Sequence, residues 1–393
     1  MMFPPRCKQN HRDLPPACCR ALYVHVPFCA AKCAYCDFYS VAFDDAASTA
    51  YVHAAAAEWN AHAHQVARPL ESVYVGGGTP TVLPVERLSE LLDIPRAWRG
   101  PETEFSVEAN PGTLDLAKAA ALTEAGVNRV TLGAQSFDDA ELQRLGRIHS
   151  AAQARQAAGL LRAAGIDNLG LDLIYGIPGQ SFPSWDRTLA EALALAPQHV
   201  SCYALSFEPG TPMAAALHAG EVREMDEDLQ EACYRRAIEA CARAGLEQYE
   251  LSNFARPGRP CRHNLTYCRN EPYLGIGPAA ASYLGGLRRT NRPDLGAYVG
   301  AHRRGVAPPA TGERLAGRAA MAETVMLALR LLEGLDRKCF MDRYGQDVGQ
   351  AFPQSLARHV ALGMLEVTAS HVRFTSQALF VADAVLADIL AEA

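Results

Sequence analysis

Short apolar segments alternate six times with longer helical patterns in the first half of the chain, and this alternation constrains the fold most strongly. The apolar segments are 22–27, 72–76, 104–108, 129–134, 168–173 and 200–205. The helical patterns between them, with apolar residues three and four positions apart, include 46–62, 85–92, 114–125 and 185–195. Six such units predict an α/β fold with a parallel sheet, either open or curled into a partial barrel.

Unusual residues follow most of these segments where each predicted strand ends. The clusters occupy positions 25–29, 76–80, 108–111, 133–136 and 172–176. In parallel α/β folds, ligands bind at the carboxyl ends of the strands. We therefore expect these clusters to converge on one site.

The C-terminal part has a different pattern. Its predicted elements are helices at 318–332, 336–344 and 355–362, short alternating strands at 364–367 and 372–375, and a final helix. This order resembles a winged-helix domain. The segment 317–393 has seven Lys and Arg against nine Asp and Glu, and the whole chain carries a net charge of −6. Because nucleic-acid binding requires a positive surface, we expect no nucleic-acid partner.

Twelve cysteines are many for a chain without an evident secretory signal. No apolar stretch reaches the roughly eighteen residues of a membrane-spanning helix, so we expect a cytoplasmic protein with reduced thiols. Cys29, Cys33 and Cys36 form a C-x3-C-x2-C motif after the first predicted strand. Three such thiolates can hold three corners of an iron–sulfur cube or, together with His25, a zinc ion.

The other strand ends carry groups suited to a polar ligand. The glycine-rich turn at 76–80 allows close approach of a ligand to the backbone, or forms a plain tight turn. Glu108 could accept hydrogen bonds from a ribose diol, and Gln135 and Arg147 could donate to a carboxylate or a ribose. Asp172 follows an apolar strand, where an unpaired charge is costly, so we expect it to have a ligand or a cationic partner.

The cysteine spacing, the aromatic Tyr35 within it and the glycine-rich turn resemble the radical S-adenosylmethionine (SAM) superfamily. The segments LYVHVPFCAAKCAYCDF, VGGGTP, EANPGT, GAQSF, LGRIH and LDLIYGIPGQ resemble more narrowly the oxygen-independent coproporphyrinogen III oxidase family. The resemblance implies that Cys29, Cys33 and Cys36 bind a [4Fe–4S] cluster whose open iron binds SAM. It also implies a SAM site lined by Tyr23, Tyr35, Gly77, Gly78, Thr79, Glu108, Gln135, Arg147, Asp172 and Ala204.

Three features indicate the heme-chaperone branch of this family. Phe38 stands where the dehydrogenases of the family have a fourth cysteine, and only about twenty residues precede the first predicted strand. His263 begins an H-N-x-x-Y segment that resembles the heme motif of this branch, which implies that His263 binds heme. The tryptophan that ends this motif is replaced by Cys268, and Ala281 stands where many relatives have histidine.

The resemblance predicts a partial (β/α)6 radical SAM barrel with a C-terminal helical, winged-helix-like domain. The predicted boundaries are an N-terminal extension over 1–20, expected to be mobile, a core with the heme motif over 21–310, and the C-terminal domain over 311–393. The implied function is delivery of heme to apo-hemoproteins, respiratory ones above all, with an electron donor for the cluster and no membrane span.

Three alternatives remain open at this point: a coproporphyrinogen III dehydrogenase, a radical SAM methyltransferase and a zinc protein. We assign no catalytic residue, and whether SAM is cleaved in turnover stays open.

Overall fold

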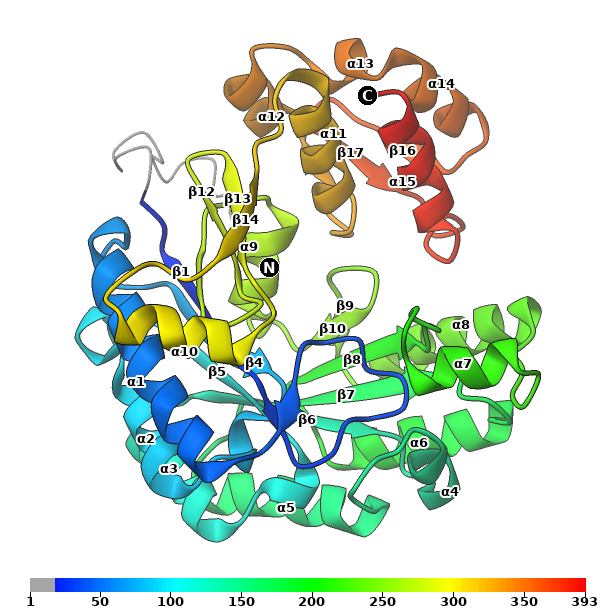
Figure 1. Cartoon of the computed structure of the whole chain (residues 1–393). Coiled ribbons are helices and arrows are strands. Elements are labelled where there is room, and N and C mark those ends of the chain that lie inside the picture. The colour runs from blue at the N-terminus through cyan, green and yellow to red at the C-terminus, as the bar shows by residue number, and fades with distance from the viewer. Residues whose placement is uncertain (1–17) are drawn as a thin grey trace.

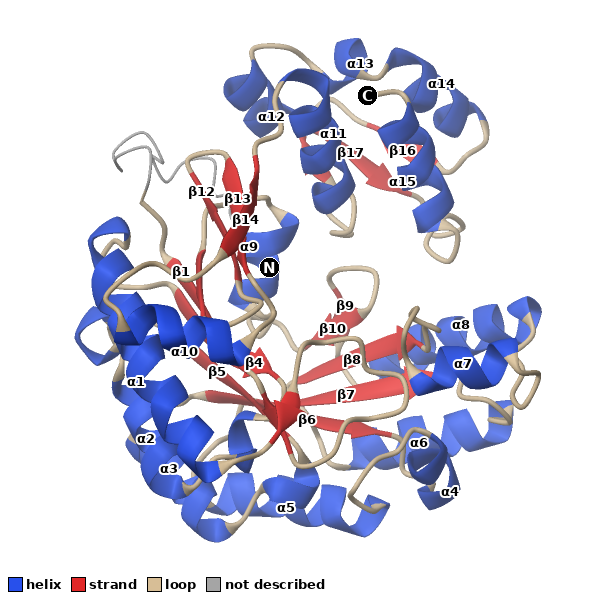
Figure 2. Ribbon diagram, in the orientation of Figure 1, coloured by secondary structure: helices blue, strands red, loops and turns tan. Residues whose placement is uncertain are grey.

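The computed structural model describes residues 18–393 and is built around a curved sheet of nine strands (Figures 1 and 2). Six parallel strands form its centre: β1 (Ala21–Val26), β4 (Ser72–Gly77), β5 (Glu104–Ala109), β6 (Arg129–Gln135), β7 (Leu169–Tyr175) and β8 (His199–Ala204). These are the six predicted strands. At one edge β11 (Leu274–Ile276) pairs in parallel with β1, and at the other the antiparallel strands β10 (Asn253–Ala255) and β9 (Glu247–Gln248) follow β8.

Helices cover the outer face of this sheet, as Figure 2 shows. They are α1 (Asp45–His62), α2 (Val85–Asp93), α3 (Leu116–Glu124), α4 (Asp139–Arg144), α5 (Ala151–Ala163), α6 (Phe182–Ala194), α7 (Pro212–His218) and α8 (Glu227–Arg243). Short 3-10 turns lie at Ala63–Gln65, Pro80–Val82, Arg96–Trp98 and Pro111–Thr113. Side-chain caps fix the helix starts: Ser150 and Gln153, for example, form a capping box at α5. Trp59 and Trp185 are buried between helices and sheet, so the barrel is a packed α/β core.

Two further sheets complete the core region. The pair β2 (Phe28–Cys29) and β3 (Val41–Ala42) closes the loop that holds the three predicted cluster cysteines. Strands β12 (Ala281–Leu284), β13 (Leu287–Asn291) and β14 (Ala310–Glu313) form an antiparallel sheet, with α10 (Leu295–Arg303) between β13 and β14. The predicted boundary between 310 and 311 falls inside β14, because that strand still pairs with the core.

The C-terminal domain has its own hydrophobic core, which includes Phe340, Phe352 and Ile389. Its elements are α11 (Gly317–Ala328), β15 (Leu335–Asp336), α12 (Arg337–Tyr344), α13 (Val348–Ala351), α14 (Pro353–Ala361), β16 (Leu365–Val367), β17 (His371–Phe374) and α15 (Ala382–Ala391). The predicted two-stranded wing is β16 and β17, and β15 adds a third strand in the order β15-β17-β16.

The N-terminal extension predicted over 1–20 is packed where the structure describes it. Cys19 is 2% exposed and pairs with Val66 in a β-bridge. The backbone of Cys19 and Arg20 bonds to residues 65–72, between α1 and the start of β4, so this end of the predicted extension packs against the core, and mobility of the extension stays a prediction. Residues 1–17 of the predicted extension lie outside the described part of the chain.

The short helix α9 (Arg262–Cys268), which carries the predicted heme motif, lies at the amino ends of three parallel strands. Ser72, Glu104 and Arg129 are the first residues of β4, β5 and β6. Ser72 bonds to His263, Glu104 accepts from the backbone N–H of Arg262, and Arg129 donates to the carbonyl of Arg259. The helix therefore lies toward the end of the barrel opposite the cysteine loop, which follows the carboxyl end of β1.

Candidate functional site

The cysteine loop is held from both sides by backbone hydrogen bonds. The N–H of Ala34 donates to the carbonyl of Leu145 at 3.0 Å, and the carbonyl of Ala34 accepts from Met213 at 2.8 Å. Thr79 donates to Cys29 Sγ at 3.6 Å, and Arg147 Nη1 donates to Cys33 Sγ at 3.3 Å. The loop thus presents its thiols against a hydroxyl and a guanidinium, both of which stabilise thiolates.

Burial raises the pKa of the Cys36 thiol, and the neighbouring thiols of Cys33 and Cys29 raise it further. Such a thiol becomes a thiolate when a cation or a metal cluster compensates its charge. Three thiols on one loop that line one cavity are the donor set that a cuboidal iron–sulfur cluster takes.

The zinc alternative required His25 as a fourth ligand. His25 is buried, with Nδ1 at 3.1 Å from the hydroxyl of Tyr23 and Nε2 at 2.9 Å from the carbonyl of Tyr39. His25 therefore belongs to the packing beneath the loop.

The glycines of the turn at 76–80 are needed for packing within the protein, whereas the sequence suggested close approach of a ligand or a plain tight turn. A Cβ at Gly76 would lie 2.7 Å from the carboxyl carbon of Glu108, and one at Gly78 would lie 2.5 Å from the carbonyl oxygen of Phe28. Gly77 has φ of +103° and donates its N–H to Glu108. The N–H groups of Gly78 and Thr79 also donate to backbone carbonyls. The glycines are therefore required by the packing of the protein itself, and these three N–H groups are not available to a ligand.

Glu108 lies at the centre of the predicted SAM site. Its Oε1 accepts from the Tyr74 hydroxyl at 2.8 Å, and its Oε2 accepts from the N–H of Gly77 at 3.2 Å. Burial raises the pKa of Glu108 to about 7, and the bond from Tyr74 partly offsets this. The carboxylate is thus oriented by two donors and changes charge near neutral pH.

Gln135 is held in a strained backbone conformation. Its φ is +65°, which few residues other than glycine adopt, and the register of β6 against β7 shifts between Leu132 and Gln135. Gly133 makes room for two side chains, because a Cβ there would lie 2.9 Å from Gln135 Nε2 and 3.1 Å from Arg147 Nη2. Strain of this kind concentrates at functional sites.

Asp172 is opposite Ser201 in the pairing of β7 with β8. Burial raises its pKa to about 6, while a bond from Ser201 and the charges of Arg129 and Arg147 lower it. The expected cationic partners are therefore present, and no salt bridge within 4 Å joins them to Asp172 among the described side chains. The carboxyl group, bonded to Ser201, lines the cavity.

These groups share one cavity of about 590 Å³. Its wall includes all the predicted site residues: Tyr23, Cys29, Cys33, Tyr35, Cys36, Gly77, Gly78, Thr79, Glu108, Gln135, Arg147, Asp172, Ala204 and His263. The structure thus brings the strand-end clusters together as the alternation predicts, although their roles as ligands stay predictions.

Sequence reasoning missed several residues deeper in the same cavity, among them Tyr74, Arg129 and His199. Arg129 and His199 are 1% and 2% exposed, and Arg129 Nε and His199 Nδ1 have no hydrogen-bond partner. The sequence could have indicated Arg129 and His199, because each is a charged or polar residue at the start of a strand, directly before an apolar run. Tyr74 could be found from its alternation with Ser72 on one face of β4.

His263 is 1% exposed, with Nδ1 at 3.0 Å from the hydroxyl of Ser72 and Nε2 at 2.8 Å from the hydroxyl of Tyr267. Burial lowers its pKa to about 3, so the ring is neutral at pH 7. Neutral imidazole is the form that binds metals. Both nitrogens are occupied in this conformation, so one bond must break before His263 can ligate iron.

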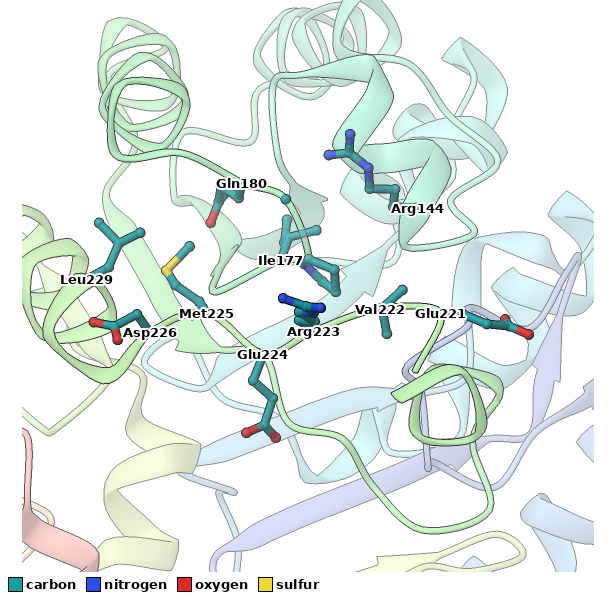
Figure 3. Close-up of a pocket in the computed structure, with 12 residues that line it drawn as sticks. Arg144, Ile177, Gln180, Glu221, Val222, Arg223, Glu224, Met225, Asp226 and Leu229 are labelled. Carbon is teal, nitrogen blue, oxygen red and sulfur yellow. The ribbon is translucent and has the colours of Figure 1, made fainter. Parts of the chain in front are cut away.

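A second hollow of about 450 Å³ lies beside the loop after β7 (Figure 3). Arg144, Arg223 and Glu224 line it together with Ile177 and Val222. It contains none of the predicted site residues.

The comparisons with known proteins agree with this geometry. Residues 23–192 match the model of the radical SAM superfamily, and residues 315–381 match that of the HemN C-terminal domain. Coproporphyrinogen III oxidase (HemN) of Escherichia coli, described as a radical SAM enzyme, superposes with a TM-score of 0.81 over 98% of this chain and 93% of its own, at 21% identity. The fold and the site thus define a radical SAM protein.

Relatives that are similar in sequence identify the family more narrowly. The heme chaperone HemW of Bacillus subtilis is 32% identical over 377 residues, which cover 95% of this chain and 100% of the relative. HemW of Mycobacterium tuberculosis is 36% identical over 94% of both chains, and HemW of Escherichia coli is 38% identical over 68% of this chain and 70% of its own. The chain belongs to the HemW family of heme chaperones.

Proposed function

We propose that this protein binds heme and passes it to apo-hemoproteins, while holding a [4Fe–4S] cluster and SAM in the barrel. The observation that carries the proposal is the match with HemW heme chaperones over the full length of the Bacillus subtilis relative. The zinc and methyltransferase alternatives account for neither this match nor the heme motif.

The residues present fit the two cofactors. Cys29, Cys33 and Cys36 would hold the cluster, and Glu108 would accept hydrogen bonds from the ribose of SAM. A reduced cluster beside SAM supplies one-electron chemistry when both are bound. Thr79 and Arg147 stabilise two of the thiolates, and the loop contacts through Ala34 hold the cysteines at the mouth of the cavity.

Heme is the cargo, and we propose His263 as its iron ligand. The iron would take the place of the Tyr267 hydroxyl at Nε2, while Ser72 keeps the ring oriented through Nδ1. Cys268, at the position of the motif tryptophan, is buried and 8% exposed. Its small side chain leaves less aromatic surface for the porphyrin than the tryptophan of the motif would.

The dehydrogenase alternative is not favoured. Position 38 is a phenylalanine, 62% exposed at the wall of the cavity near the cluster thiols, where the dehydrogenases of this family carry a fourth cysteine. A phenyl ring cannot bind iron, so it does not replace that thiol.

Respiratory apo-hemoproteins are the proposed acceptors, and a reductase or similar protein the proposed electron donor. Within the described residues, no helix is both long and apolar enough to cross a membrane. We propose that a membrane acceptor is reached through a partner protein, and that heme transfer takes place in the cytoplasm.

Heme binding by anaerobically prepared protein tests this function. Wild type should bind heme, His263→Ala should bind it at least tenfold more weakly, and Tyr267→Phe should bind it at least as tightly as wild type. A parallel assay should detect no CO2 release from coproporphyrinogen III. Undiminished heme affinity in His263→Ala contradicts the ligand assignment, and robust CO2 release contradicts the chaperone function.

A further inference from the structure

The ring of His263 packs on the inner face of β4. Ser72 and Tyr74 are alternate residues of this strand, so their side chains share one face. Ser72 bonds to His263 Nδ1, and the ring of Tyr74 stacks on the imidazole with centroids 5.3 Å apart and planes 26° apart. The heme-motif histidine therefore contacts the strand that leads to the glycine-rich turn.

The other end of Tyr74 holds the predicted ribose ligand. Its hydroxyl donates to Glu108 Oε1 at 2.8 Å. Gly76 leaves space for the carboxyl group, because a Cβ there would lie within 2.9 Å of each of its oxygens. The N–H of Gly77 holds the other oxygen, Oε2, at 3.2 Å. A tilt of the Tyr74 ring would move its hydroxyl away from Oε1 and weaken its bond to Glu108.

The imidazole is in turn fixed from α9. Tyr267, one helical turn after His263, bonds to Nε2 at 2.8 Å, and its own ring packs edge-on to that of Tyr273 with centroids 4.6 Å apart. The ring of His263 thus has a bond at each nitrogen and an aromatic ring on its face, so it supports Tyr74 in a single position.

We propose that His263 is a positioning residue for the SAM site, acting on Glu108 through the stacked ring of Tyr74. This role extends the proposed function and depends on it, because it takes Glu108 as the residue that binds the ribose of SAM.

Binding of SAM and of methionine to heme-free, cluster-loaded protein tests this proposal. Methionine has the amino and carboxylate groups of SAM but no ribose, so its affinity does not depend on Glu108. His263→Ala and Tyr74→Phe should each weaken SAM binding by about fivefold to tenfold, which lies within the range for loss of one ordinary hydrogen bond, and leave methionine binding unchanged. The double variant should bind SAM no more weakly than Tyr74→Phe alone, because both changes act on one carboxylate.

His263→Phe is the conservative variant, because it keeps an aromatic ring on Tyr74 and lacks the imidazole. It should retain SAM affinity within about twofold and lose heme binding. His263→Leu replaces His263→Ala if the alanine variant does not fold, as judged by circular dichroism and cluster content.

Wild-type SAM affinity in His263→Ala or His263→Leu overturns the inference, as does an equal loss of methionine affinity. Failure of the wild type to bind heme would instead reject the proposed function. The role of His263 at the SAM site would still be decided by the SAM and methionine affinities, which are measured without heme.

Discussion

Arg147 donates a hydrogen bond to the sulfur of Cys33 over 3.3 Å, and its second terminal nitrogen donates to the carbonyl of Gly133 at 2.6 Å. One guanidinium therefore ties the cysteine loop to the end of β6. Because it is charged and only partly exposed, it acts on the thiolate with less screening by solvent than a surface arginine would. The group expected as a SAM ligand thus also contacts the proposed cluster.

Replacing Arg147 with Gln should make the cluster harder to reduce. A nearby cation and a hydrogen bond to sulfur favour the reduced, more negative cluster. We expect the midpoint potential to fall by roughly tens of millivolts, measured by potentiometric titration followed by electron paramagnetic resonance. Arg155→Gln, at a half-exposed arginine paired with Glu191, is the matched control. An unchanged potential in Arg147→Gln would show that the contact with Cys33 does not act on the cluster.

Cys33→Ala should abolish the cluster. Anaerobic protein should lose the broad visible absorbance of a [4Fe–4S] cluster and its stoichiometric iron and sulfide. Cys233→Ala is the control, because Cys233 is fully buried in the core and lies outside the cavity. Iron retained in Cys33→Ala, or stoichiometric zinc without iron in the wild type, would refute the cluster assignment.

SAM binding should strengthen as the pH rises from 6 to 8. The pKa of Glu108 is raised to about 7, and only the ionised carboxylate accepts from both ribose hydroxyls. Below this pKa the affinity should fall by up to about tenfold per pH unit, measured by calorimetry. Methionine, which has the amino and carboxylate groups of SAM but no ribose, serves as the reference for effects of pH that do not involve Glu108. In Glu108→Gln, the binding of SAM and of methionine should depend on pH in the same way. If SAM binding still depends more strongly on pH than methionine binding, Glu108 is not the cause.

The same carboxyl group should lower the stability of the fold at high pH. Its pKa rises from 4.5 to about 7 on folding, so the folded protein binds this proton more tightly than the unfolded chain. The resulting loss in the free energy of unfolding is absent below pH 4.5 and complete above pH 7, where it is on the order of 3 kcal/mol.

Glu108→Gln should therefore raise the Tm at pH 8 by a few degrees and change it less at pH 5, measured by thermal unfolding of the cluster-loaded protein. Glu124→Gln, at an exposed carboxylate, should leave both values unchanged. A lower Tm for Glu108→Gln at pH 8 would contradict the burial cost assigned to the ionised Glu108.

The sequence predicted the six central strands because their apolar runs are short, buried and separated by regular helices. It also indicated the strand ends as the site, since parallel strands bring their carboxyl ends together. It could not show that Gly76 and Gly78 make room for Glu108 and for the backbone of Phe28, because such contacts join distant segments. It could not place His263 either: α9 follows an irregular region, and only the tertiary fold brings it to Ser72 and Tyr74.

Heme transfer tests the central claim most directly. Protein carrying the cluster, SAM and one heme is mixed with an apo-hemoprotein that binds heme without covalent attachment, and the acceptor spectrum is followed anaerobically. After incubation with equal amounts of heme and removal of unbound heme, wild type should transfer heme to the acceptor, whereas His263→Phe should retain and transfer little or none, and neither should release CO2 from coproporphyrinogen III. Heme that stays with the wild-type protein, or transfer at equal rates by both, would contradict delivery of heme through His263.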